Sequence, residues 1–220
     1  MSADAYPPTD RTTPTRLRER VGYDRAAAHA VLDEATVCHV GFVVDGRPVV
    51  LPQLHVRVGD DLYLHGSTGA RSLRIAADVG LEVCVTVTLV DGLVLARSAF
   101  NHSVNYRSVV VRGRAHVVQD PAEKAGVLRR LVDAVVPGRS EHVRGADRKE
   151  LAATAVLAVP LREVSLKARG GPPSDEPRDL DGGHWAGVVP LSVVAGAAEP
   201  APDLTPGVPV PAHVTALTRG

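Results

Sequence analysis

Apolar residues follow two different periods along the sequence. Between Asp24 and Ala35 they recur at helical spacing, and Asp24 can cap the first turn of that helix. Residues 36–44 form a run rich in β-branched side chains, apolar residues return from 47 to 58, and the Asp45-Gly46 pair between them is a strong signal for a two-residue hairpin turn. The pattern therefore predicts a helix followed by two antiparallel strands.

Further strand patterns follow this first hairpin. They cover residues 62–65, 81–90, 93–98 and 105–118. We expect Asp91-Gly92 to form a second hairpin turn and Gly113 to form a β-bulge, because glycine inside a strand pattern is typical of bulges. Pro48 and Pro52 cannot donate hydrogen bonds to a sheet, so they predict an edge, a bulge or a ligand-facing stretch.

A second helix is predicted after residue 119. Asp120 can cap it, Pro121 suits its first position, Glu123 resembles the partner in a capping box, and Pro137 would end it. Residues 151–169 predict a short helical lead-in and one last strand. Six or seven strands with helices between them predict a mainly β fold with α-helices (α+β), a closed or partly closed antiparallel barrel.

Composition divides the chain into three parts. Residues 1–20 are rich in proline, threonine and charge without an apolar period, so we expect a flexible N-terminal arm. Residues 21–190 are long enough for one domain with a sizeable core. Residues 191–220 are rich in proline and alanine, so we expect a C-terminal tail.

Charge and cysteine content exclude several classes of partner. Lys+Arg and Asp+Glu number 25 each, so no net field attracts nucleic acid or an anionic membrane, and we expect neither as a partner. No early apolar segment resembles a signal peptide, and no apolar run is long enough to span a membrane. Cys38 and Cys84 lack CxxC spacing, so we expect two buried thiols rather than a disulfide. These features predict a soluble cytoplasmic protein.

The loop at residues 66–69 is a candidate phosphate site. Its sequence, Gly-Ser-Thr-Gly, lies between a strand and a short predicted helix that carries Arg71, Ser72 and Arg74. Backbone N–H groups at a helix start, the Ser67 hydroxyl and an arginine fork are groups that bind anions. The alternative is an ordinary strand-to-helix turn with solvated arginines, since neither GxxxxGK[ST] nor GxGxxG is present.

Few residues suggest acid, base or metal chemistry. The nine histidines form neither HExxH nor His-x-His, so we predict no metal site. His65 is the exception to follow, because it stands at the strand end that faces the predicted phosphate loop. Without an obvious acid, base or nucleophile, the sequence favours chemistry carried by a bound cofactor.

Two other positions invite a binding role. Arg107, with Tyr106 and Ser108 beside it, forms a polar cluster that could reach a ligand, although most strand arginines are simply solvated. Trp185 is the only tryptophan and lies in a segment rich in glycine and proline. It either pins this segment to the body or covers a planar cofactor.

The ordered set of stretches resembles the pyridoxamine 5′-phosphate oxidase-like flavin-nucleotide-binding family, in particular its nitroimidazole-resistance-protein-like branch. After the first helix, the stretches are TVCHVGFVVDGRPVVLPQ, LYLHGSTGARSLRI, VCVTV, NYRSVVVRGRAHVV and LKARGGPPSDEPRDLDGGHWAGVVPL. The resemblance covers about residues 20–190. It implies a Greek-key split β-barrel that forms a homodimer and binds FMN at the subunit interface.

The resemblance also implies which residues bind the cofactor. Those residues are Val50, Leu51, Pro52, Gln53, His65, Gly66, Ser67, Arg71, Ser72, Arg107, Ser108 and Trp185. The strand stretch would run along the flavin ring, Arg71 would hold the phosphate, and Trp185 would close the site. Only Arg71 stands at a matching basic position, and a C-terminal arginine-rich substrate motif is absent, so vitamin B6 oxidation is not expected.

The function expected from the resemblance is that of an FMN-dependent oxidoreductase acting on a small organic acceptor, as a nitroreductase does. His65 is then the candidate catalytic residue. The alternative is a non-catalytic protein that binds or senses a flavin, a deazaflavin or haem. Sequence alone leaves open the substrate, the electron donor and whether the protein turns over at all.

Overall fold

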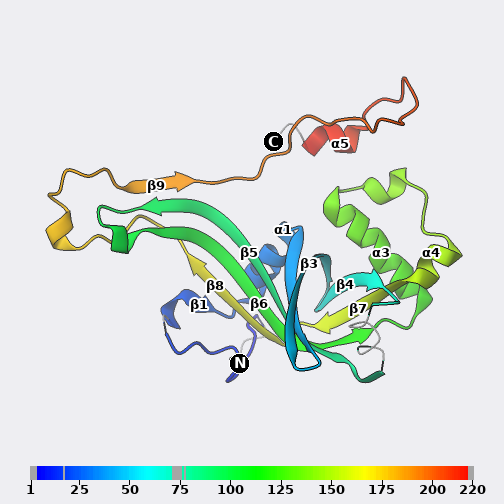
Figure 1. Cartoon of the computed structure of the whole chain (residues 1–220), viewed down its shortest axis with the longest axis horizontal. Coiled ribbons are helices and arrows are strands. Elements are labelled where there is room, and N and C mark those ends of the chain that lie inside the picture. Colours follow the sequence, from blue (N-terminus) through cyan, green and yellow to red (C-terminus); the bar gives the residue numbers. More distant parts are fainter. Residues whose placement is uncertain (1–3, 17, 71–75, 77, 218–220) are drawn as a thin grey trace.

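The computed structural model describes residues 4–16, 18–70, 76 and 78–217 (Figure 1). In this part of the chain, nine strands form one antiparallel sheet in the order β1-β8-β6-β7-β4-β3-β2-β5-β9. The strands are β1 (Val21–Gly22), β2 (Val37–Val44), β3 (Arg47–Val58), β4 (Asp61–Ser67), β5 (Leu81–Leu95), β6 (Ser103–Val117), β7 (Thr154–Pro160), β8 (Glu163–Arg169) and β9 (Gly187–Pro190). The helices are α1 (Arg25–Glu34), α3 (Pro121–Val135), α4 (Arg148–Ala153) and α5 (Ala212–Leu217), with short 3₁₀ turns η1 (Arg18–Arg20), η2 (Ala99–Asn101), η3 (Arg139–His142) and η4 (Pro177–Asp179).

A further pairing between β5 and β6 closes part of the sheet into a ring. The ring contains β2, β3, β4, β7, β6 and β5, while β8 with β1 and β9 extend it as flaps. This confirms the partly closed antiparallel barrel with flanking helices that the sequence predicts.

The first hairpin and both predicted long helices are confirmed. Asp45 and Gly46 have φ angles of 52° and 71°, as a two-residue turn of this hand requires, and Val44 pairs with Arg47. Asp24 caps α1 by accepting a hydrogen bond of 2.7 Å from the Ala27 N–H. Pro121 begins α3, whose N-cap Asp120 accepts from two backbone N–H groups.

Asp91-Gly92 does not form the predicted hairpin turn. Strand β5 continues through this pair, and its register with β6 shifts between Val90 and Gly92. The pair is therefore an irregularity inside one long strand, and the chain turns later, through residues 96–102. Gly113, the predicted bulge, pairs in regular register with Val83.

The stretch 151–169 forms two strands instead of one. Strands β7 and β8 are separated by Leu161 and Arg162, and β7 pairs with β4 while β8 pairs with β6.

The capping box predicted from Glu123 is absent at α3. The box occurs at α4, where Asp147 and Glu150 bond to each other's backbone N–H groups.

Among the described residues, buried apolar side chains form two clusters. The larger lies inside the ring and against α1, and includes Leu62, Leu64, Val85 and Val111. The smaller lies on the outer side of β4 and β7, where α3 packs; its members are Tyr63, Val118, Val127, Leu131 and Val156. Strand alternation explains the division, because even positions of β4 enter the ring while Tyr63 and His65 face the other way.

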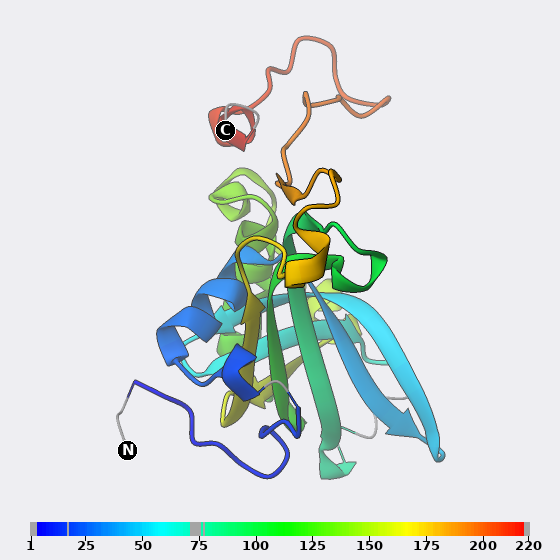
Figure 2. The ribbon, with the colours of Figure 1, turned by 90° about the vertical axis from the view of Figure 1, so that its left-hand side faces the viewer.

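The N-terminal segment contributes to the core. The Tyr6 side chain is 1% exposed, its N–H donates to the Tyr23 carbonyl at 2.8 Å, and Ala5 bridges to Asp24. The division into arm, domain and tail stays a prediction, but residues around Tyr6 lie against α1 and β1. At the other end, residues after β9 extend above the body toward α5 (Figure 2).

Two further expectations concern thiols and membranes. Cys38 and Cys84 are free cysteines, and burial raises the pKa of the Cys38 thiol to about 12. Among the helices of the described residues, none combines the length and apolar character needed to cross a bilayer.

Candidate functional site

An apolar hollow of about 530 Å³ lies beside α3, on the outer face of the barrel. Its walls come from the C-terminal half of α3, from β3, β4 and β7, and from the segments around η3. The lining residues are Leu54, His65, Leu128, Leu131, Val132, Val135, Val136, Arg139, Ala146 and Thr154. The volume falls in the range of small-molecule and cofactor sites, and so does the mixture of many apolar walls with few polar groups.

His65 is one of three polar side chains that line this hollow, together with Arg139 and Thr154. It lies two residues after Tyr63 on β4 and therefore on the same face, toward α3. Its Nδ1 is buried and has no hydrogen-bond partner among the described residues. A buried, unpaired polar atom is costly, so this side chain calls for an explanation, as do those of His55, Asn101 and His213.

The side chain next to His65 is fully engaged. The Tyr63 hydroxyl donates to the Glu123 carboxylate at 2.9 Å, which ties β4 to the first turn of α3. Burial, and then this hydrogen bond, raises the pKa of Tyr63 to about 12. Tyr63 therefore stays protonated and fixes α3 over the strand, while His65 remains available.

Arg139 on η3 also lines the hollow and gives it a positive charge. In the described part of the chain its guanidinium makes neither an ion pair nor a side-chain hydrogen bond, although its N–H donates to the Val136 carbonyl. An arginine without a carboxylate partner can bind an anionic group of a ligand. The hollow thus combines apolar walls, an imidazole and a cation at one edge.

Sequence reasoning singled out His65 but missed the hollow. The signal was present in α3, where the apolar stripe continues to Val132 and Val135 although both remain exposed. A stripe wider than its own domain can cover is a sign of a ligand site or an interface.

The predicted strand stretch from Val50 to Gln53 lies in β3, paired with β2 on one side only. Strand β4 pairs with β3 from His55 onward, so the other edge of this stretch has no strand partner in the described residues. Val50 is 63% exposed and Leu51 is 40% exposed. The expectation that the prolines mark an edge is confirmed, and the stretch leaves apolar side chains and backbone groups open to a ligand or a second subunit.

The predicted phosphate loop uses its donors internally. The Gly69 N–H donates to Ser67 Oγ at 3.3 Å, the Ala70 N–H donates to the Ser67 carbonyl at 2.9 Å, and Thr68 donates to the Ala153 carbonyl. Gly66 pairs with Ala155 as the end of β4. Arg71 and Ser72, together with Arg74, lie outside the described residues, so the phosphate site stays a prediction.

Arg107 and Ser108 lie on β6 and are separated from the Val50–Gln53 stretch by β2 and β5. The Arg107 guanidinium binds the Asp91 carboxylate at 2.7 Å and the Glu34 carboxylate at 2.8 Å, and these hydrogen bonds raise its pKa. Ser108 Oγ donates to the Val87 carbonyl at 2.9 Å. Within one chain these side chains link α1, β5 and β6, and a role toward a flavin held by a second subunit stays a prediction.

Trp185 is 67% exposed and precedes β9. Its indole folds over Gly187, where a Cβ atom would lie only 2.9 Å from the ring. A side chain at position 187 would displace the exposed indole, which does not pack into the barrel. Whether it covers a cofactor stays a prediction.

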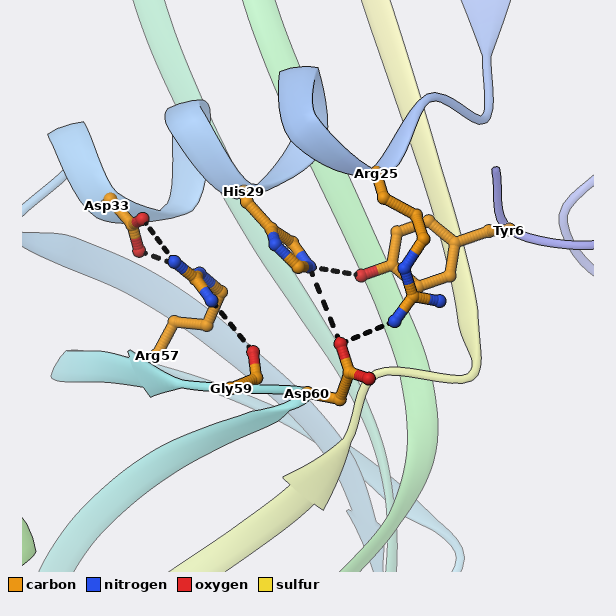
Figure 3. A network of polar contacts seen from close by, with 7 residues as sticks. All are labelled: Tyr6, Arg25, His29, Asp33, Arg57, Gly59 and Asp60. Carbon is orange, nitrogen blue, oxygen red and sulfur yellow. Dashed lines mark hydrogen bonds and ion pairs between the residues drawn. The ribbon is translucent and has the colours of Figure 1, made fainter. Parts of the chain in front are cut away.

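A separate polar network holds the N-terminal segment (Figure 3). The Tyr6 hydroxyl and His29 Nε2 are 2.6 Å apart, and the Arg25 guanidinium lies 4.4 Å from the centre of the Tyr6 ring while pairing with Asp60. Burial, followed by the charge of Arg57 and Arg25, lowers the pKa of His29. Each group in this network has a partner, so we assign it to stability rather than to ligand binding.

Comparison with known proteins places this geometry in a family. Residues 24–168 match the family described as pyridoxamine 5′-phosphate oxidase. No curated protein matches the sequence. Among solved structures, the flavocytochrome Anf3 from Azotobacter vinelandii is 40% identical with a TM-score of 0.89, covering 96% of this chain and 98% of its own.

Two other solved structures extend the comparison. A FAD and haem binding protein from Mycobacterium smegmatis is 41% identical with a TM-score of 0.85, covering 90% of this chain and 97% of its own. A protein described as a 5-nitroimidazole antibiotic resistance protein, from Bacteroides thetaiotaomicron, is 22% identical with a TM-score of 0.56, covering 67% and 85% of the two chains. The predicted nitroimidazole-resistance branch is thus less similar than the two relatives near 40% identity, and shares the fold alone. The chain belongs to the pyridoxamine 5′-phosphate oxidase family.

Proposed function

We propose that this protein binds a flavin and a haem, and that His65 is a ligand of the haem iron. The observation that carries the proposal is the place of His65 in the wall of the apolar hollow beside α3, where its side chain makes no hydrogen bond within the described residues. The two relatives near 40% identity, described as a flavocytochrome and as a FAD and haem binding protein, support it.

The residues of the hollow fit a haem. The macrocycle is apolar, and the walls are mostly leucine, valine and alanine. Neutral imidazole is a common iron ligand, and His65 has no competing hydrogen bond in the described residues. The free guanidinium of Arg139 at the rim is suited to a propionate carboxylate.

The flavin is proposed to bind along the open edge of β3, at Val50–Gln53. Backbone groups on that edge have no strand partner in the described part, and isoalloxazine rings carry polar atoms along one side. FAD is proposed in place of the FMN expected from the sequence, because the relative from Mycobacterium smegmatis is described as binding FAD.

The proposed binding state is a homodimer with the flavin at the interface. Val43, Val50 and Leu51 leave apolar surface exposed on the β2–β3 hairpin, and Val90 and Leu93 do so on β5. Exposed apolar patches of this kind mark interfaces. We therefore propose a second copy of this chain as the partner.

The bound groups would supply electron transfer. The chain's own residues would hold the haem (His65, Arg139), keep water out of the hollow (the α3 stripe) and fix α3 by the Tyr63–Glu123 hydrogen bond. An acid or base aimed at a substrate is not part of this set. We therefore propose a redox-active binding protein, and treat nitroreductase-like catalysis as an outcome of the test.

The test is the cofactor content of the purified full-length protein, supplied with haem, FAD and FMN in turn. We expect haem addition to give a Soret band that is sharper than that of free haem and shifted from it, and we expect the protein to retain FAD more tightly than FMN on gel filtration. Flavin binding without this shifted Soret band would overturn the haem proposal. Turnover of a nitroaromatic with NAD(P)H by the flavin-loaded protein would restore the oxidoreductase interpretation.

A further inference from the structure

The segment from Leu191 to Val210 follows β9 and is here called the C-terminal arm. Every residue in it is exposed, and it contains neither a helix nor a strand. Between residues 192 and 203, backbone hydrogen bonds donated by the arm are absent among the described residues. The arm extends away from the barrel before the chain returns at α5 (Figures 1 and 2).

The arm combines ten glycine, alanine and proline residues with six valine and leucine residues. Val193 is fully exposed and Val194 is 73% exposed, and three more apolar side chains farther along are about half exposed. Glu199 and Asp203 are its only charged residues. Solvated linkers are normally rich in charge and poor in valine and leucine, so this composition indicates a surface that covers the arm.

Both ends of the arm are fixed. At its start, the Leu191 N–H donates to the Asp91 carbonyl at 3.1 Å, next to the pairing of β9 with β5. At its end, the imidazole of His213 on α5 stacks on that of His142 on η3, with ring centroids 4.2 Å apart. Four prolines, Pro200, Pro202, Pro206 and Pro209, stiffen the chain in between. A stiff segment held at both ends loses less entropy when something binds under it.

A second copy of this chain offers apolar surface that the arm can cover. In a twofold dimer each copy offers the same patches, so an exposed apolar arm needs an exposed apolar face on its own sequence. The β2–β3 hairpin supplies that face with Val43, Val50 and Leu51. Twenty arm residues together with the strand residues reach the roughly 20–30 residues a side of a standard protein interface.

We propose that the C-terminal arm lies as a strap across the second subunit, covering the β2–β3 hairpin beside the proposed flavin edge. This inference rests on the homodimer of the proposed function and adds the segment that holds it. Each subunit would then complete the cofactor site of the other with its arm.

Hydrogen–deuterium exchange of the full-length protein tests the strap. Peptides covering residues 192–203 should exchange slowly where light scattering shows a dimer and quickly after dilution to the monomer. A dimer whose arm exchanges at unprotected rates would overturn the strap and leave the homodimer intact. A monomer at all concentrations would overturn both, and an arm already protected in the monomer would show that it packs on its own chain.

Paired substitutions provide a second measurement. Val193→Asp with Val194→Asp should raise the dimer dissociation constant by about a hundredfold, because two buried valines would become charged. Val79→Asp is the matched control, since Val79 is equally an exposed valine but lies outside the arm and the hairpin. Equal dissociation constants for the double variant and wild type would contradict the proposal.

Discussion

Replacing Tyr6 should destabilise the whole domain, although it lies in a segment that composition alone describes as a flexible arm. Its side chain is 1% exposed, its hydroxyl is 2.6 Å from His29 Nε2, and its ring lies under the Arg25 guanidinium. A buried tyrosine covers about 150–250 Å² of surface, and truncating a large aromatic to alanine typically costs about 3–5 kcal/mol. We expect Tyr6→Ala to lower the free energy of unfolding by that amount.

Tyr6→Phe separates the hydrogen bond from the packing. It keeps the ring and removes the hydroxyl, so it should cost about 1 kcal/mol. Tyr106→Phe is the matched control, because Tyr106 is half-buried and its hydroxyl forms no hydrogen bond in the described residues. We expect that control to change stability by less than about 0.5 kcal/mol.

The assay is urea denaturation followed by far-UV circular dichroism, with all variants in the same buffer. A set of midpoints ordered wild type, Tyr6→Phe, Tyr6→Ala is expected. If Tyr6→Ala unfolds within about 0.5 kcal/mol of wild type, residues 4–13 do not contribute to the core and the packing argument fails.

Three further predictions concern pH, a cap and a close approach. The pKa of His29 is lowered below its usual 6.5, so the unfolded chain binds a proton at this position more readily than the folded chain does. The contribution of His29 to stability should therefore be complete above about pH 6.5 and should be lost as the pH drops toward the folded pKa. Urea titrations at each pH should show a smaller loss of stability in His29→Gln than in wild type. Asp147→Ala removes the capping box of α4 and should cost about 1 kcal/mol in the same titrations, and an unchanged free energy of unfolding would contradict this. Gly92→Ala would place a Cβ 3.1 Å from the backbone of β9 and should cost about 1–3 kcal/mol. Gly126→Ala is the control, because a Cβ at this position in α3 would meet no atom within 4 Å, and it should stabilise the protein by about 0.5–1 kcal/mol. Equal effects of the two substitutions would refute the steric argument.

The sequence predicted helix starts and the first hairpin correctly where contacts between adjacent residues determine the structure. Asp24 and Asp120 bond to free N–H groups of the turn that follows, and this depends on adjacent residues only. The Asp45-Gly46 turn works in the same way, since both residues tolerate positive φ.

The same dipeptide signal failed at Asp91-Gly92 because tertiary pairing decides there. Strand β6 pairs with β5 on both sides of the shift, and β9 adds to the same stretch, so the strand continues. The Glu123 carboxylate is drawn away from the helix N-terminus by the Tyr63 hydroxyl, a contact across 60 positions. Such long-range partners are invisible to a reading of neighbouring residues.

The candidate site was predicted in part. His65 could be singled out from its place at a strand end, but its surroundings depend on α3, which begins more than fifty positions later. The role of Arg107 was also hidden, because its two carboxylate partners lie on α1 and β5.

The most direct test of the central claim is a haem titration of His65→Ala beside the control His116→Ala. His116 is an exposed strand histidine that does not line the hollow. We predict that wild type and His116→Ala give the same shifted Soret band and dissociation constant, while His65→Ala loses the shift or binds haem at least about tenfold more weakly, because it lacks the proposed iron ligand. An unchanged Soret spectrum and affinity in His65→Ala, with the fold intact by circular dichroism, would contradict the assignment of the iron to this hollow.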